Sequence, residues 1–374
     1  MNKKLIIAII VVIVVILGVW LSQNKPNNTN NVIKIGYYGP LTGAAAGTSG
    51  EDVANGYRIA NSIQNMIGDK KVEIIFEDDA CDPQKAVSAA NKLINIDKVN
   101  ILINGVCSGS MVAVAPIAES HKVILFTNVS ESPKITTAGD YIFRISASSV
   151  LSAHAMVEGL NKLGLNKISV IFETAEYTVG MKDAFVKEFV ENKSNKILAT
   201  EAFASKDTDL RTQLSILAKA KPQILVVFAN STITANIITN QLKDLGAKLP
   251  IIGNTYFGSG PARTNPNNNG NYAIVYKYDT ASPSIIKFLS DYKTRFGRSP
   301  TQDIYSALSY DGYNVIFQAL QTCNGDNPDC IKTALYKVKN YQGIGGVVTI
   351  DQNGDTQREF TLKKIQDGSA VEVK

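Results

Sequence analysis

Short hydrophobic runs alternate with amphipathic segments from Val32 onward. The β-rich runs are expected to form strands at 32–38, 71–77, 99–104, 122–127 and 141–146. Helices are expected between them at 51–67, 84–96 and 109–120, and in the first of these the apolar residues recur at helical spacing. This alternation predicts a parallel sheet that is covered by helices on both faces.

A second series of similar size follows Arg144. Its strands are expected at 167–173, 197–203, 223–229, 250–256 and 272–279, and helices at 150–163, 179–191, 208–220, 232–245, 283–296 and 303–321. The segments 346–355 and 358–368 are expected to pair as a hairpin, with a turn at Asn353-Gly354-Asp355. Two such arrays predict an α/β chain of two lobes. Ligands of such sheets bind beyond the carboxyl ends of the strands, so the cleft between the lobes is the expected site.

The N-terminal segment has a different character. Lys3 and Lys4 precede an uncharged apolar run from Leu5 to Leu21, which suits a short bilayer span or a long signal sequence. A small-residue cleavage pattern is not obvious after it, and Trp20 lies where an interfacial anchor would. We therefore expect residues 1–21 to be an uncleaved signal anchor, a transmembrane helix that leaves the rest of the chain outside the cytoplasm. The Asn-rich residues 22–31 are expected to be a flexible linker.

The composition and net charge limit the kinds of protein that this chain can be. The 374 residues are 45% hydrophobic and 19% charged, which is typical of a globular chain long enough for two domains. The formal net charge is +5, and the basic residues are scattered rather than gathered in a run with aromatic residues. Nucleic acid is therefore not an expected partner.

Four cysteines occur in a chain that is expected to be exported, which favours disulfides. Sequence alone leaves three pairings open, but the spacing favours one of them. Cys81 and Cys107 each follow a predicted strand of one strand-helix-strand unit, so they meet at one sheet edge, and Cys323 and Cys330 flank a turn. We expect Cys81–Cys107 and Cys323–Cys330 bonds. A metal site and a catalytic cysteine are the alternatives.

Catalytic and metal-binding motifs are missing from the sequence. It has no CxxC pair, and only two histidines, His121 and His154, neither of them in a predicted cleft loop. The adjacent Asp78 and Asp79 suit a turn better than an acid/base pair. We therefore expect no enzyme activity, no cofactor and no metal.

Three stretches together resemble the Leu/Ile/Val-binding protein family, type I periplasmic binding proteins that deliver ligands to ABC importers. They are "IKIGYYGPLTGAAAGTSGEDVANGYRIA", "DDACDPQKAVSAANKLIN" with "INGVCSGS" after it, and "YQGIGGVVTIDQNGD". The resemblance runs from Val32 to the end of the chain. It implies two lobes, three crossing segments and ligand capture by hinge closure. We expect lobe one to comprise 32–146 and about 279–345, and lobe two 147–278 and about 346–374.

The resemblance also suggests ligand-binding residues. The family's Ser after the second cysteine of the disulfide binds the ligand's α-carboxylate, and Ser108 holds that place. A helix starting at Gly109 would favour an anion there, although Ser108 could equally be a plain helix cap. Tyr177 matches the family's Tyr in the first loop of the second lobe. Val129 is expected beside Ser108 on lobe one.

Four further positions differ from the family pattern. Glu131 replaces a usual Thr, Ser49 an aromatic residue, Thr255 the acid that binds the α-ammonium group, and Ser231 lies near a ligand-contacting Tyr. A cleft carboxylate at Glu131 could hold an ammonium group by a charge-assisted hydrogen bond. Its alternative is a solvated loop acid.

The resemblance thus implies a membrane-anchored solute-binding protein of an ABC importer, with an ABC permease as partner. Its ligand would be an amino acid, branched-chain-like, or a related small polar molecule. The alternative is a ligand-sensing receptor subunit of the same fold. Because only "MNKK" would face the cytoplasm, such a receptor would act through a partner.

Overall fold

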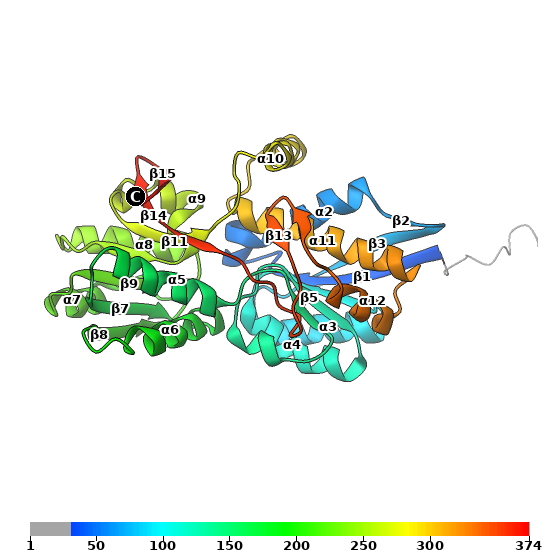
Figure 1. The fold of residues 1–374 in the computed structure, drawn as a ribbon, viewed down its shortest axis with the longest axis horizontal. Coiled ribbons are helices and arrows are strands. Elements are labelled where there is room, and N and C mark those ends of the chain that lie inside the picture. The colour runs from blue at the N-terminus through cyan, green and yellow to red at the C-terminus, as the bar shows by residue number, and fades with distance from the viewer. Residues whose placement is uncertain (1–30, 374) are drawn as a thin grey trace, which may run out of the picture.

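The computed structural model describes residues 31–373. The expected signal anchor (1–21) and nearly all of the expected linker (22–30) lie outside the described residues. Within 31–373, no helix combines the length and the apolar character that a bilayer span needs. Two lobes lie side by side, lobe one in blue, cyan and orange and lobe two in green and yellow (Figure 1).

Lobe one is built on a six-stranded sheet in the order β2-β3-β1-β4-β5-β6. All its pairings are parallel except β2 with β3. Its strands are β1 (Val32–Gly39), β2 (Met66–Ile67), β3 (Lys70–Asp78), β4 (Ile101–Asn104), β5 (Ile124–Thr127) and β6 (Ile142–Arg144). Its helices are α2 (Glu51–Ile63), α3 (Pro83–Asn95), α4 (Ser108–His121), α10 (Pro283–Phe296), α11 (Asp303–Cys323) and α12 (Pro328–Tyr336).

Lobe two is built on a seven-stranded sheet in the order β15-β14-β11-β10-β9-β7-β8. The five strands β7, β8, β9, β10 and β11 run parallel to one another. Strand β14 pairs antiparallel with β11, and β15 pairs antiparallel with β14. The strands are β7 (Lys167–Glu173), β8 (Lys196–Phe203), β9 (Ile224–Phe228), β10 (Ile251–Gly253), β11 (Tyr272–Tyr276), β14 (Phe360–Gln366) and β15 (Ser369–Glu372). The helices are α5 (Ser149–Lys162), α6 (Glu176–Phe189), α7 (Arg211–Lys219), α8 (Thr232–Asp244) and α9 (Gly260–Thr264). The predicted mostly parallel sheets of a two-lobed α/β fold are thus confirmed.

The central strands of each sheet are buried on both faces, as their near-continuous apolar sequences require, whereas the edge strand β8 is exposed at alternate positions. In β1, Ile35 and Tyr37 join the core beneath α2 and α11, whereas Tyr38 joins the core beneath α3 and α4. In lobe two, Val226 faces the first core and Val227 the core beneath α7 and α8. Because successive strand side chains point to opposite faces, a strand covered on both sides must be apolar at every position.

Helices α2 and α11 pack closely because of a glycine. A Cβ atom built on Gly56 would lie 2.4 Å from the carbonyl oxygen of Ser306. Any larger residue would push the helices apart. This contact joins an early and a late segment of the chain in lobe one.

The turn "DDACDP" shows why acids surround Cys81. Asp82 caps α3, since its carboxylate accepts hydrogen bonds from the backbone N–H groups of Gln84 (2.8 Å) and Lys85 (3.0 Å). Asp79 accepts one from the N–H of Cys81 at 2.8 Å. The acids therefore stabilise the turn, as the sequence predicted.

Both predicted disulfides are present. Cys81 bonds to Cys107 with Cα atoms 5.5 Å apart, and Cys323 bonds to Cys330 with Cα atoms 5.9 Å apart. The first joins the loop after β3 to the residue before α4. The second joins the end of α11 to the first turn of α12, a helix that the sequence pattern did not predict.

The C-terminal hairpin prediction is wrong. A turn does form at 351–355, with one antiparallel bridge between Ile350 and Thr356. However, β13 (Gly346–Val348) pairs with β12 (Tyr341–Gly343), whereas β14 pairs with β11 and β15. After the turn the chain continues in an extended conformation, because β14 pairs with β11 at the edge of the lobe-two sheet instead of folding back on β13.

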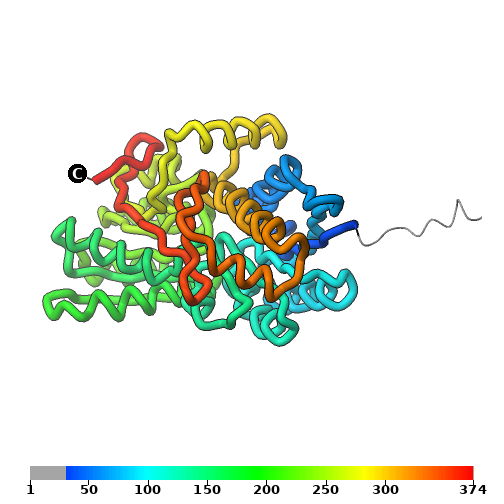
Figure 2. Tube along the Cα trace, turned by 45° about the vertical axis from the view of Figure 1, so that its right-hand side comes forward, coloured from blue at the N-terminus to red at the C-terminus, as the bar shows by residue number. Residues whose placement is uncertain are grey.

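Three segments connect the lobes, at 145–148, 277–282 and 349–359. The expected division placed 346–374 in lobe two. In the structure the backbone N–H of Arg144 in β6 donates to the carbonyl of Gly354, and only β14 and β15 join the lobe-two sheet. Figure 2 follows this orange-to-red part of the chain across lobe one to the C-terminus on lobe two.

Candidate ligand-binding cleft

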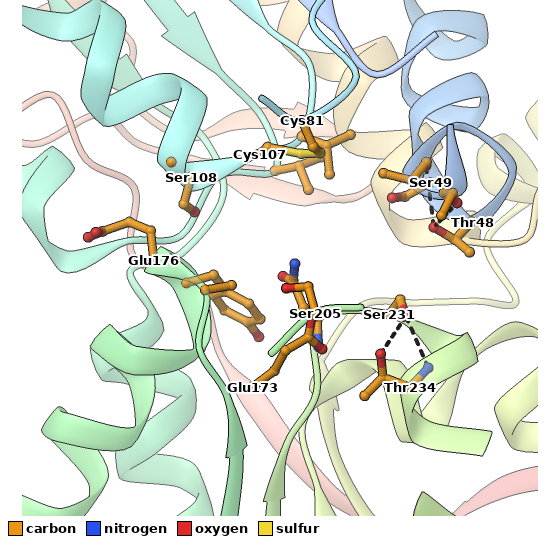
Figure 3. Close-up of a pocket in the computed structure, with 18 of the residues that line it drawn as sticks. Thr48, Ser49, Cys81, Cys107, Ser108, Glu173, Glu176, Ser205, Ser231 and Thr234 are labelled. Atoms are coloured by element: carbon orange, nitrogen blue, oxygen red, sulfur yellow. Dashed lines mark hydrogen bonds between the residues drawn. A yellow bond between two sulfur atoms is a disulfide. The ribbon is translucent and has the colours of Figure 1, made fainter. Parts of the chain in front are cut away.

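A cavity of about 730 Å³ lies between the lobes. Figure 3 shows Ser108 and the cysteines of lobe one facing Glu173, Ser205 and Ser231 of lobe two across it. Its lobe-one wall comes from Ala44, Ala45, Thr48, Ser49, Ala80, Cys81, Pro83, Val106, Cys107, Ser108, Gly109, Val112, Ala113, Val129, Glu131 and Tyr305. Its lobe-two wall comes from Glu173, Thr174, Ala175, Glu176, Tyr177, Ser205, Asn230, Ser231, Ile233, Thr234 and Tyr256.

Six of the seven residues proposed from the sequence line this cavity: Ser49, Ser108, Val129, Glu131, Tyr177 and Ser231. Ser231 is also the cap of α8, because its hydroxyl accepts the N–H of Thr234 at 3.1 Å. Thr255 is not among the lining residues. Its hydroxyl donates to the carbonyl of Ile274 at 3.3 Å, and its neighbour Tyr256 reaches the cavity instead.

Ser108 begins α4 at the edge of the cleft. The cap residue Cys107 makes no side-chain hydrogen bond to the helix, so the first N–H groups of α4 keep their capacity to bind an anion. The Ser108 hydroxyl accepts hydrogen bonds from the backbone N–H groups of Glu131 (3.1 Å) and Ser132 (3.2 Å). Its own proton is left to donate. The arrangement therefore offers a hydroxyl and a helix N-terminus to a negatively charged group.

Glu131 lies beside Ser108 and is only 2% exposed. One carboxyl oxygen, Oε1, accepts a hydrogen bond from the Tyr276 hydroxyl of lobe two at 2.5 Å. The other, Oε2, is buried without a hydrogen-bond partner among residues 31–373. Burial raises the pKa of Glu131 to about 7, against the opposing effects of the Tyr276 hydrogen bond and the Arg144 charge. Glu131 is thus no solvated loop acid.

A second buried carboxylate faces the cleft from lobe two. Glu173 ends β7, is 2% exposed, and accepts the N–H of Asn230 at 3.0 Å through Oε2. Glu173 was not among the residues proposed from the sequence. The available signal was its place at the carboxyl end of a predicted parallel strand, where ligands of such sheets bind.

Aromatic rings enclose the polar groups. Tyr256 and Tyr305 lie edge to face with ring centroids 6.1 Å apart. Asn254 donates to the Tyr177 hydroxyl at 3.2 Å, which orients that ring. Burial raises the pKa of all three tyrosines, so their hydroxyls stay neutral. Tyr305 comes from the first turn of α11, where no sequence pattern singled it out.

The charge of the cleft is one-sided. Glu131, Glu173 and Glu176 line it, and none of the lining residues in the described chain is Lys, Arg or His. Glu176 is already paired across the lobes, with the Lys134 ammonium at 3.0 Å and the Ser132 hydroxyl at 2.8 Å. Both histidines lie elsewhere, exposed on helices. Across residues 31–373, no group of three or more His, Cys, Asp or Glu side chains could hold a metal ion.

Comparison with known proteins agrees with this architecture. The model of the periplasmic binding protein family matches residues 32–370. The leucine-, isoleucine-, valine-, threonine- and alanine-binding protein of Pseudomonas aeruginosa is 25% identical over 352 residues, covering 92% of this chain and 93% of the relative.

Solved structures share the fold. A leucine-binding protein, LivK, from Thermotoga maritima superposes with a TM-score of 0.80 at 25% identity, covering 90% of this chain and 97% of that one. A solute-binding protein of an ABC transporter from Rhodopseudomonas palustris, in complex with 3,4-dihydroxybenzoic acid, superposes with a TM-score of 0.81 at 23% identity, covering 91% and 95%. Such proteins bind solutes and are not enzymes. With a family match over nearly the whole described chain and a cleft between two α/β lobes, the protein belongs to the periplasmic binding protein family.

Proposed function

We propose that the chain is the extracytoplasmic solute-binding protein of an ABC importer and captures an α-amino acid in the interlobe cleft. One observation carries the proposal. The Ser108 hydroxyl at the N-terminus of α4 accepts the backbone N–H of Glu131, so an anion site and a buried carboxylate are neighbours. An α-amino acid presents a carboxylate and an ammonium group on one carbon. The pair of sites matches this head group.

The charge of the cleft favours amino acids over aromatic acids as ligands. Some structural relatives are described in complex with benzoic-acid derivatives, which carry a carboxylate and no cation. In this chain such an anion would share the cleft with the buried Glu131 and Glu173, without a basic lining residue in the described chain to offset the repulsion. An ammonium group relieves that repulsion. The charge balance therefore favours a zwitterion.

Capture would proceed by hinge closure. The ligand docks on lobe one at Ser108, Val129 and Glu131, and lobe two then presents Tyr177 and Ser231. The ligand stabilises the closed form only through contacts that the open form lacks. An ABC permease would recognise the closed form. A sensing receptor with the same cleft would instead pass closure to a signalling partner.

Isothermal titration of the purified full chain, kept in mild detergent because of its apolar N-terminal run, tests the proposal. We expect leucine, norleucine or another α-amino acid to bind and benzoate not to bind. Ser108→Ala should weaken binding by about 10- to 100-fold, since it removes a hydrogen bond to a charged group. Ser88→Ala, on the exposed face of α3, is the matched control. Benzoate binding without any amino-acid binding would refute the proposal.

A further inference from the structure

With Glu131 and Glu173 both ionised, the cleft holds more negative charge than a neutral amino acid can offset. Glu176 already has the Lys134 ammonium as a partner. Glu131 and Glu173 are each 2% exposed, and neither forms an ion pair among the described residues. A neutral amino acid brings one ammonium group, and the anion site at α4 takes its carboxylate. One buried carboxylate would then remain without a cation, which is unfavourable.

The two carboxylates occupy different parts of the cleft. Glu131 is on lobe one, where its carboxylate accepts the Tyr276 hydroxyl, its Oε2 is buried without a partner among residues 31–373, and its backbone N–H donates to the Ser108 hydroxyl. Glu173 is on lobe two, fixed by the N–H of Asn230, and lies near Ser205 in the lower part of Figure 3, away from Ser108. A head group held by Ser108 and Glu131 on lobe one leaves Glu173, on the opposite wall of the cavity, for the rest of the ligand.

Aromatic rings lie around these groups. Tyr256 lies within the electrostatic influence of both carboxylates. Burial raises the pKa of Tyr256, and the negative charges of Glu131 and Glu173 raise it further. With Tyr177 and Tyr305 it also lines the cavity. Tyrosine faces and carboxylates together are a favourable setting for an organic cation, since the ring face is electron-rich.

We infer that the ligand carries a second positive group on its remote end, which pairs with Glu173, so that the ligand class is the basic α-amino acids. This inference rests on the proposed function and deepens it. The α-ammonium pairs with Glu131, the α-carboxylate with Ser108 and the N-terminus of α4, and the side-chain cation with Glu173. Ser205 and Asn230 are the neighbouring polar groups that complete this remote end.

Lysine and norleucine form the probe pair, because norleucine is lysine without its side-chain ammonium group. Titration of the full chain should give a dissociation constant for lysine at least about 10-fold below that for norleucine. In Glu173→Gln this preference should disappear, while norleucine still binds. The lysine-to-norleucine ratio is measured within one variant, so a partial loss of folding does not change it. Glu191→Gln removes the same charge at an exposed site and should keep the preference.

The outcomes separate the two proposals. Norleucine binding as tightly as lysine in the unaltered chain overturns the basic-ligand inference and leaves amino-acid capture standing. A lysine preference that persists in Glu173→Gln also overturns it, because Glu173 is then not the partner. Cadaverine, the diamine without the carboxylate, binding as tightly as lysine overturns the anion site of the proposed function and supports the cation site. If neither lysine nor norleucine binds, the basic-ligand inference fails, and amino-acid capture fails with it only when leucine and the other α-amino acids also do not bind.

Discussion

Glu131 makes the stability of the unliganded chain depend on pH. A glutamate ordinarily titrates at 4.5, whereas burial raises the pKa of Glu131 to about 7 in the folded chain. Between these pH values the unfolded chain has already released the proton and the folded chain still holds it. The contribution of Glu131 is therefore fully present below pH 4.5 and is lost as the pH rises to about 7. Above that pH the loss is complete and constant.

The expected size follows from the two pKa values. Each pKa unit corresponds to about 1.4 kcal/mol, so the ionised carboxylate should lower the free energy of unfolding by about 3 kcal/mol at pH 8 relative to the protonated form. Glu131→Gln keeps the shape of the side chain and removes its titration. The variant should consequently be the more stable protein at pH 8, with little of that advantage at pH 5.

Urea unfolding of both proteins from pH 5 to pH 8.5, without ligand, measures the effect. The quantity to follow is the difference between their free energies of unfolding, because titrations of distant groups cancel in it. We expect this difference to grow by roughly 2–3 kcal/mol across the range. A difference independent of pH would refute the reasoning, because it would mean that Glu131 ionises as easily in the folded chain as in the unfolded one.

Two further predictions concern the frame of the site. Arg144 is fully buried and pairs with Asp355 at 2.6 Å. Arg144→Met should therefore lower the free energy of unfolding by about 3–5 kcal/mol, and replacing both partners by apolar residues should recover most of that loss. If urea unfolding shows no recovery in the double variant, the prediction is contradicted. Replacing Cys81 and Cys107 by serine should cost about 3–4 kcal/mol, since their bond closes a loop of 26 residues. The second disulfide spans only 7 and should contribute about 2 kcal/mol in the same assay, so an equal or larger loss there would rule out the loop-entropy explanation.

Local patterns were enough to predict most of the frame. The central strands are buried on both sheet faces, so hydrophobicity alone marked them, and the amphipathic segments between the strands became helices. The disulfide between Cys81 and Cys107 followed from a rule of parallel sheets, that the carboxyl ends of neighbouring strands share one edge. The position of Ser108 at the start of α4 followed from the helix that was expected at 109–120.

The pairing of the C-terminal strands could not be predicted in this way. The sequence Asn353-Gly354-Asp355 predicts that the chain reverses direction, and the chain does turn at 351–355. Which edge the next strand joins depends on which edges the rest of the fold leaves open. Here β14 adds to β11, far away in the sequence.

The sequence by itself thus determined the two lobes, the disulfides and the place of Ser108 at a helix N-terminus, because these depend on residue type and on the order of strands and helices along the chain. Tertiary structure decided the charge and shape of the cleft. Glu173 at a strand end has the sequence pattern of a solvated acid but is buried in the folded chain, and Tyr305 reaches the cavity only because its helix, α11, packs beside the cleft. Thr255 and Tyr256 are adjacent in sequence, yet only Tyr256 lines the cavity. Burial and direction are properties of the assembled lobes, and no local pattern contains them.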